Sequence, residues 1–200
     1  MKTAKNQLKE NFVTGKILHL DGDKRYSEKS LRYYKKMGLN AIVKNIPEYK
    51  QPKLVYDLLK YYTPDILVIT GHDGIIKKDK GYADIYNYKN SRYFIETVRE
   101  ARRYEREQAA DIAIFAGACE SYFEALIMAG ANFASSPARI QIDFADPIAI
   151  AKKIATTDSI QFITMGDVEK ELRDGRRGVG GIGANRKEIL QKCYKNVTQM

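Results

Sequence analysis

Short apolar runs alternate with longer polar segments along most of this chain. The runs are rich in Ile, Val and Leu, a composition typical of strands that are buried on both faces. The polar segments between them repeat their apolar residues with a helical period. This alternation predicts a mostly parallel sheet with helices on both faces, which is a three-layer α/β/α fold. Strands are expected at 15–23, 40–46, 65–70, 111–117, 138–144 and 159–165.

The predicted helices follow the strands in order. Pro52 suits the first turn of one of them, because its missing N–H has no helical partner there. Helices are expected at 24–37, 51–63, about 90–107, 121–130 and 147–156, and the tail from Gly166 is expected to hold a helix, a Gly-rich stretch and a last helix.

Length and composition indicate one globular domain. Two hundred residues can bury a real core, and 44% hydrophobic with 30% charged residues and no long apolar run exclude a membrane-spanning or disordered chain. We divide the chain into an N-terminal extension, 1–14, and one domain, 15–200. The start "MKTAKNQLKENF" lacks the apolar stretch of a secretory signal, so we expect a cytoplasmic protein with free thiols and no membrane partner.

The net charge of +9 raises the possibility of a nucleic-acid partner. The basic residues are mixed with acids in helical stretches such as "VREARRYEREQ" at 98–108, which is typical of a solvated helix face with Glu/Arg pairs. The aromatic residues are spread along the chain and form no stacking platform. We therefore expect no nucleic-acid partner.

Two of the apolar runs end in residues that carry chemistry. The run "DILVITGHDG" at 65–74 contains His72, one of two histidines, and "DIAIFAGACES" at 111–121 contains Cys119, one of two cysteines. Both residues follow the carboxyl ends of predicted parallel strands, where ligands and catalytic groups gather. Because neighbouring strands are about 4.8 Å apart, we expect the two side chains to come within reach of each other.

This pair fits nucleophilic catalysis. An imidazole and a helix N-terminus both favour the thiolate form of a nearby thiol, which attacks carbonyl carbons. Gly71 and Gly74 leave room for backbone amides, so we expect an oxyanion hole made by the Cys119 amide and an amide of Asp73 or Gly74. Taken singly, the cysteine would be a small buried hydrophobe and the histidine a hydrogen-bonded loop residue. The joint pattern favours catalysis.

Longer motifs resemble those of the YabG family of sporulation-specific cysteine proteases from endospore-forming bacteria, over about residues 15 to 190. The motifs are "LHLDGD", "PDILVITGHDG", "VREARRYE", "IFAGACESYFEALIMAGANFASSPARI" and "GRRGVGGIGA". The resemblance implies a peptidase of the mother-cell cytoplasm, associated with the spore coat, that processes spore coat and cortex-lytic precursor proteins after Arg or Lys. It also implies that a small-barrel region precedes the protease portion in family members and is absent here.

In caspases the histidine precedes the cysteine by about 50 residues, and the arrangement of the His and Cys blocks here also resembles the wider caspase, gingipain and legumain group. A caspase-like fold and a catalytic dyad of His72 and Cys119 follow from this resemblance. The group has Gly directly after the histidine, whereas Asp73 intervenes here, and this leaves the oxyanion donor open.

The resemblance to caspase-like sheets also implies that the end of the first strand helps to form the pocket for the residue before the cut. That end carries Asp21 and Asp23, which could pair with a guanidinium through charge-assisted hydrogen bonds. Asp143 and Asp146 are the second candidates, since they follow the strand after the cysteine. The alternative for "DGD" is a polar turn that caps the next helix. We expect no metal and no cofactor.

Four remaining features lead to smaller predictions. "GVGGIG" at 178–183 matches a dinucleotide fingerprint but follows no strand, so we expect a loop near the cleft or a turn. The neighbouring "RDGRRG" offers arginines for self-cleavage. We expect His19 to be buried and hydrogen-bonded within its strand, and Cys193 to pack in the last helix.

Two other functions stay open at this point. The first is a non-catalytic assembly or binding protein of the spore coat, for which the α/β domain serves as a scaffold. The second is a cysteine amidase that acts on small substrates in a closed pocket. A reactive Cys119 would favour the cysteine protease or the amidase over the scaffold, because a scaffold needs no reactive thiol.

Overall fold

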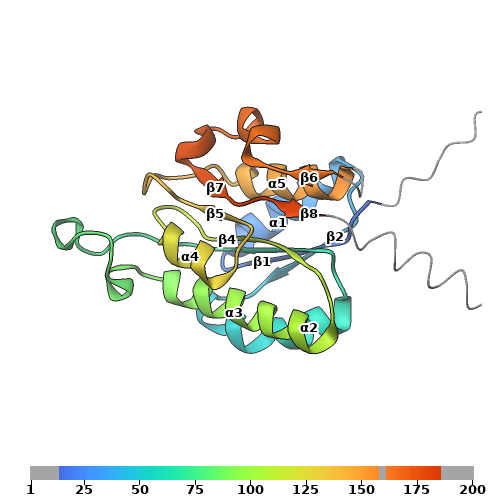
Figure 1. Cartoon of the computed structure of the whole chain (residues 1–200), viewed down its shortest axis with the longest axis horizontal. Coiled ribbons are helices and arrows are strands. Elements are labelled where there is room, and N and C mark those ends of the chain that lie inside the picture. Colours follow the sequence, from blue (N-terminus) through green and yellow to red (C-terminus); the bar gives the residue numbers. More distant parts are fainter. Residues whose placement is uncertain (1–13, 158–160, 186–200) are drawn as a thin grey trace, which may run out of the picture.

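The computed structural model describes residues 14–157 and 161–185, and a six-stranded sheet forms its centre (Figure 1). The order across the sheet is β2-β1-β3-β4-β5-β7. All neighbouring pairs are parallel except β5 and β7, which are antiparallel. The strands are β1 (Ile17–Asp21), β2 (Ala41–Asn45), β3 (Ile66–Thr70), β4 (Ala113–Ala116), β5 (Phe133–Ser135) and β7 (Val179–Gly181).

Helices cover both faces of this sheet. They are α1 (Lys24–Lys36), α2 (Gln51–Tyr62), α3 (Ser91–Gln108), α4 (Phe123–Ala129) and α5 (Ala145–Thr156). Figure 1 shows α2, α3 and α4 on one side of the strands and α1 and α5 on the other. None of the helices in the described ranges combines the length and the apolar content that a bilayer crossing needs.

Side chains alternate along each central strand and feed two separate cores. In β3, Val68 packs with α1 and α5, whereas Leu67 and Ile69 pack with α2 and α3. Every residue of β1 and β3 is buried. Continuous burial explains why β3 appears in the sequence as an apolar run, and why the polar residues of β1, His19 and Asp21, are buried as well. The predicted three-layer α/β/α fold with a mostly parallel sheet is confirmed.

The first four predicted strands and the five helices predicted before Gly166 are confirmed within a few residues. Local signals explain their ends. The Asp23 side chain accepts hydrogen bonds from the first turn of α1 and so caps it. Thr63 adopts a left-handed φ of 43° at the end of α2, and Gly130 does so with a φ of 112° at the end of α4.

The predicted strand at 138–144 is wrong. Its place in the sheet is taken by the shorter β5, which lies earlier in the chain. Residues 138–144 form a loop, in which the Ser136 hydroxyl accepts from the Ile140 amide at 2.9 Å and donates to its carbonyl at 3.1 Å. Arg139 has a φ of 53°, which an extended strand does not allow.

The C-terminal part also differs from the prediction. Of the predicted strand 159–165, the structure describes 161–165, where Phe162–Ile163 form β6, which pairs with β8 (Ala184–Asn185) outside the main sheet. The Gly-rich stretch, predicted as a loop or turn, contributes the edge strand β7. Short 3₁₀ turns replace the helix expected after Gly166. The 3₁₀ turns within the described residues are η1 (Glu48–Lys50), η2 (Lys78–Lys80), η3 (Ile85–Asn87), η4 (Met165–Asp167), η5 (Glu169–Glu171) and η6 (Gly175–Arg177).

Some predictions fall on other parts of the chain. The N-terminal extension, apart from Thr14, and the last helix with Cys193 lie outside the described residues.

Candidate active site

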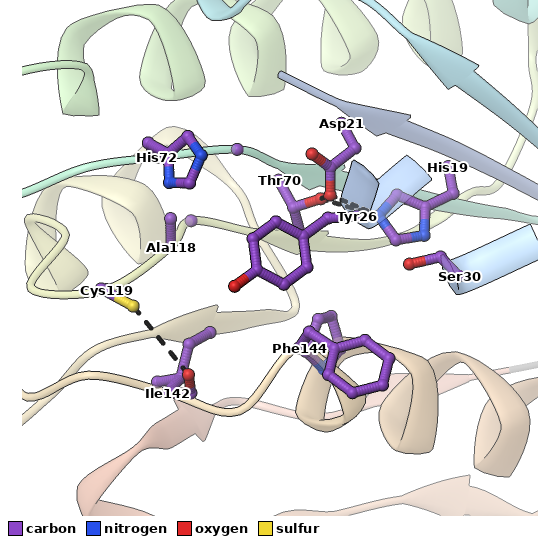
Figure 2. Close-up of a pocket in the computed structure, with 13 residues that line it drawn as sticks. His19, Asp21, Tyr26, Ser30, Thr70, His72, Ala118, Cys119, Ile142 and Phe144 are labelled. Carbon is purple, nitrogen blue, oxygen red and sulfur yellow. Dashed lines mark hydrogen bonds and ion pairs between the residues drawn. The ribbon is translucent and has the colours of Figure 1, made fainter. Parts of the chain in front are cut away.

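A cavity opens at the carboxyl ends of β1, β3 and β4 (Figure 2). It contains the three groups on which the sequence prediction depends, namely His72, Cys119 and Asp21. Figure 2 shows His72 and Cys119 on one side of this cavity and Asp21, Thr70 and His19 on the other. The lining residues are His19, Asp21, Tyr26, Ser30, Thr70, Gly71, His72, Gly117, Ala118, Cys119, Ile142, Phe144 and Pro147.

Cys119 lies in the turn that follows β4. Its thiol is half-buried and donates a long hydrogen bond to the Ile142 carbonyl, with 3.9 Å between the heavy atoms. The next residue, Glu120, has a φ of 54°, so the chain turns sharply directly after the cysteine. Helix α4 begins only at Phe123. The sequence had suggested that the thiol lies at a helix N-terminus, but in the structure it lies before the first turn of α4.

Gly117 makes this turn possible. Its φ of 111° is one that side chains rarely allow. A Cβ atom at this position would lie 2.8 Å from both the carbonyl oxygen and the hydroxyl of Ser135 on the neighbouring strand. The close approach of the two strands thus requires glycine two residues before the thiol.

His72 lies in the loop after β3, with 60% of its side chain exposed. Its Nε2 atom is 3.0 Å from Oδ2 of Asp23, and the edge of the Tyr26 ring packs nearby. Among the described residues, no group bonds Nδ1. The backbone is fixed as well, because Asn90 Nδ2 donates to the His72 carbonyl at 2.8 Å. The imidazole is thus held on one nitrogen and free on the other.

Glu48 fixes the same residue from the opposite side. Its Oε1 accepts the His72 backbone N–H at 2.7 Å. The carboxylate fills space next to two glycines, because a Cβ on Gly22 would lie 2.2 Å from Oε1 and one on Gly71 would lie 2.4 Å from it. Glycines at the ends of β1 and β3 therefore form a slot for this carboxylate.

Asp73 joins the histidine loop to the cysteine loop. Its Oδ1 accepts from the amides of Gly74 and Asn90 at 2.9 and 2.8 Å, and its Oδ2 accepts from the hydroxyls of Ser91 and Ser121. Ser121 Oγ also accepts the Ala118 amide at 2.9 Å. Burial raises the pKa of Asp73, and the four hydrogen bonds oppose that rise. The side chain has a structural role in aligning the two loops.

The predicted oxyanion donors differ in availability. The Gly74 amide is already bonded to Asp73 Oδ1. Within the described part of the chain, the amides of Cys119 and Asp73 donate to no other group. The Cys119 amide adjoins its own thiol, so it stays the first candidate, with the Asp73 amide second.

Asp21 is buried at the base of the cavity, with 5% of its surface exposed. Its Oδ2 accepts from the Thr70 hydroxyl at 2.7 Å and its Oδ1 from the Asp23 amide at 2.8 Å. Burial raises the pKa of Asp21, and these hydrogen bonds oppose the rise. His19 contacts the same Thr70 hydroxyl at 2.7 Å. As predicted, His19 is buried and hydrogen-bonded within its strand.

The four aspartates that the sequence offered for a substrate pocket are not brought together. Only Asp21 lines the cavity. Asp23 caps α1, as the alternative interpretation of "DGD" predicted, and it also contacts His72. Asp143 accepts from the Ala145 amide, and Asp146 accepts from the amides of Asp143 and Arg173. The last two therefore fix the start of α5, and neither lines the cavity.

Sequence patterns gave no signal for several residues of this site. Glu48 lies in a 3₁₀ turn after the second strand, and its contact with His72 depends on where β1 and β3 end. Ser91 and Ser121 are ordinary residues of a helix start and a turn in the sequence. Among the described residues, no cluster of three or more His, Cys, Asp or Glu could hold a metal ion.

Comparison with known proteins places the chain in a family. The model of the YabG peptidase U57 family matches residues 1–190. The Sporulation-specific protease YabG of Bacillus subtilis (strain 168) is 43% identical over 182 residues, which are 90% of this chain and 62% of that protein. The chain thus spans less than two thirds of the length of this relative.

A solved structure is also similar in part. The receiver domain of the histidine kinase CKI1 from Arabidopsis thaliana covers 60% of this chain and 81% of its own, with 16% identity and a TM-score of 0.39. A likeness at that level supports no conclusion about fold or function. The sequence match is the informative one, and by it the chain belongs to the YabG peptidase U57 family.

Proposed function

We propose that this chain is a cysteine endopeptidase of sporulation, with a fold of caspase-like type, in which Cys119 is the nucleophile and His72 its proton-transfer partner. The observation that carries the proposal is that both residues line one cavity, together with a buried carboxylate. Membership of a peptidase family supports it. The relative named a sporulation-specific protease supports the biological setting.

The proposed reaction has two stages. The Cys119 thiol gives its proton to His72, and the thiolate sulfur forms a bond to the peptide carbonyl carbon. The oxyanion is stabilised by the Cys119 amide, and His72 returns the proton to the amine as the C–N bond breaks. Water then attacks the acyl-enzyme, His72 takes a proton from it, and that proton returns to the sulfur as the thioester breaks.

Asp21 is the proposed recognition group for a basic side chain. Tyr26, Ile142 and Phe144 give the cavity apolar walls, against which the methylene stem of Arg or Lys can pack. Each carboxylate oxygen of Asp21 accepts one hydrogen bond and keeps acceptor capacity for a guanidinium or ammonium group. A cation at this position offsets the cost of the buried charge, so the pocket favours Arg or Lys before the cut.

The proposed substrates are spore coat and cortex-lytic precursor proteins, met in the mother-cell cytoplasm and at the spore coat. Self-cleavage in the segment 173–178 belongs to the same proposal. Arg173 and Arg176 are exposed in this segment, with 47% and 63% of their side chains accessible. Intact mass of the wild type beside a Cys119→Ala protein tests it, because a self-processed species requires the thiol.

The experiment that tests the whole proposal is digestion of a mixed peptide library, with cleavage sites identified by mass spectrometry. We expect cuts after Arg and Lys with the wild type and none with Cys119→Ala. Cys193→Ala is the matched control, because it removes the other thiol and should cleave as the wild type does. Asp21→Asn should lose cleavage after basic residues by at least about 100-fold, since the charge that holds the cation is gone.

Three results would overturn the proposal. Cleavage by Cys119→Ala at the wild-type rate would show that Cys119 is not the nucleophile. A wild type that cuts no peptide and whose Cys119 reacts with iodoacetamide like a free thiol indicates the assembly or binding protein instead. Hydrolysis of small amides without peptide cleavage would indicate the amidase.

A further inference from the structure

The two carboxylate oxygens of Asp23 have separate tasks. Oδ1 accepts the amides of Arg25 and Tyr26 at 2.7 and 3.1 Å and so caps helix α1. Oδ2 lies 3.0 Å from Nε2 of His72. One side chain therefore ties the first turn of α1 to the imidazole.

This contact determines which nitrogen of His72 holds the proton. An ionised carboxylate has no hydrogen to give, so Nε2–H must donate to Oδ2. In the neutral imidazole, the lone pair is then on Nδ1, which no group bonds in the described part of the chain. Figure 2 shows the ring on the same side of the cavity as Ala118 and Cys119. Nδ1 is thus the nitrogen left for the proton of the thiol.

Asp23 is held rigidly enough to orient the ring. Its backbone N–H donates to Asp21 Oδ1 at 2.8 Å, and its carbonyl accepts from the Ser27 hydroxyl at 2.8 Å. Only 26% of its side chain is exposed. The hydrogen bond from His72 lowers the pKa of Asp23, which keeps the carboxylate ionised at neutral pH.

We propose that Asp23 is a positioning residue that holds His72 as its Nε2–H tautomer and leaves Nδ1 free for proton transfer with Cys119. The inference rests on the proposed function and adds a positioning residue, Asp23, to the expected catalytic pair of Cys119 and His72. It also gives Asp23 a task other than the substrate recognition expected from the sequence, which stays with Asp21.

Asp23→Asn is the sharpest test, because the helix cap decides how the amide lies. Asn caps helices as well as Asp does, and its oxygen is needed by the amides of Arg25 and Tyr26. The NH₂ group then faces His72 and donates to Nε2, which forces the proton onto Nδ1. We expect kcat to fall by about 100-fold or more with little change in KM. Asp23→Ser keeps the cap but does not reach the ring, so it should lose only about tenfold.

The tautomer can be measured directly. The chain has two histidines, so the ¹⁵N ring signals of His72 are identified by comparison with His72→Ala. We expect an Nε2–H imidazole in the wild type and an Nδ1–H imidazole in Asp23→Asn. Asp84→Asn is the matched control, since Asp84 caps the short η3 turn in the same way and should leave both readouts unchanged.

The outcomes separate this inference from the proposed function. A wild-type Nδ1–H tautomer overturns the inference, and so does an Asp23→Asn protein that keeps either its tautomer or its kcat. If the wild type cleaves no peptide, the rate of Cys119 alkylation by iodoacetamide in a Cys193→Ser background replaces kcat. Slower alkylation with a reversed tautomer in Asp23→Asn then supports the positioning role even though the peptidase proposal has failed.

Discussion

His19 is a buried imidazole in the lining of the candidate site. It lies between the Tyr34 hydroxyl, 3.1 Å from Nδ1, and the Thr70 hydroxyl, 2.7 Å from Nε2, and only 1% of its surface is exposed. Desolvation lowers its pKa from 6.5 to about 3. His19 is therefore neutral in the folded protein at every pH at which a cell lives, and it acts as a structural link between α1 and β3.

This shift predicts a loss of stability in acid. Because the folded pKa is lowered, the stabilisation is complete above about pH 6.5 and is lost as the pH falls toward 3. One pKa unit corresponds to about 1.4 kcal/mol, so the loss reaches about 3 kcal/mol by pH 4. Urea unfolding from pH 7 to pH 4 should show the wild type losing more free energy of unfolding than His19→Gln. Parallel curves for the two proteins would contradict this assignment.

The opposing groups make that comparison necessary. Burial raises the pKa values of Asp21 and Asp73. A raised carboxyl pKa destabilises the fold at neutral pH and does so less as the carboxyl is protonated in acid, which is the reverse of the effect of His19. Both aspartates are present in the wild type and in His19→Gln, so the difference between the two curves reports the histidine.

At the scale of single residues, the sequence revealed groups that stand at strand ends. Cys119, His72 and Asp21 were found because a buried run precedes each of them. The contact between Asp23 and His72 was not found, since it depends on the path of the loop after β3 across the start of α1. Glu48 was not found either, because its task comes from the space left by two glycines.

At the scale of elements, strand prediction succeeded where an apolar run was long enough to be recognised as a buried strand. β1, β3 and β4 were found in this way. The predicted strand at 138–144 was wrong, and the aromatic residue at its end, Phe144, packs outside the sheet against Tyr26 and Tyr33 of α1. β5 has only three residues, and β7 is rich in glycine, so neither has a periodic signal that could be recognised.

The turn after β4 gives a prediction at this scale. Gly117→Ala must accept both an unfavourable φ and a Cβ atom 2.8 Å from the Ser135 carbonyl oxygen. We expect about 2–4 kcal/mol of lost stability, together with displacement of Cys119 and lower activity. Gly38→Ala is the control: its φ is 68°, but nothing lies within 4 Å of the new Cβ, so it should lose only about 1 kcal/mol. Equal losses in the two variants, followed by urea unfolding, would count against the packing argument.

At the scale of the whole molecule, the sheet has a protected centre and weaker edges. β3 pairs with β1 and β4 and is fully buried, whereas β2 lies at the edge of the sheet as the structure describes it, pairs with β1 and is partly exposed. Amide exchange should therefore be at least about tenfold slower for Ile66–Thr70 than for Ala41–Asn45. Hydrogen exchange with mass spectrometry of peptic fragments measures this difference. Comparable rates in the two strands would mean that the sheet opens as one unit.

The whole molecule also limits what the relatives can supply. The chain corresponds to 62% of the length of the Bacillus subtilis protease, so a comparison of the two proteins in the peptide-library assay shows what the remaining part of that relative contributes. The fold class was predictable because strands that are buried on both faces of a sheet are rich in Ile, Val and Leu. The assembly of the site was less so, since it depends on contacts between loops.

The slot around Glu48 has a consequence for recognising sites of this kind in other chains. The position of the His72 backbone depends on a carboxylate that enters only because Gly22 and Gly71 lack side chains. A sequence search based on the histidine and the cysteine alone would also accept chains that have alanine in place of Gly22 or Gly71. In such chains the added methyl group would block the carboxylate of Glu48. Gly22 and Gly71 take no part in the chemistry, yet their presence helps to distinguish a chain that assembles this site from one that only contains a histidine and a cysteine.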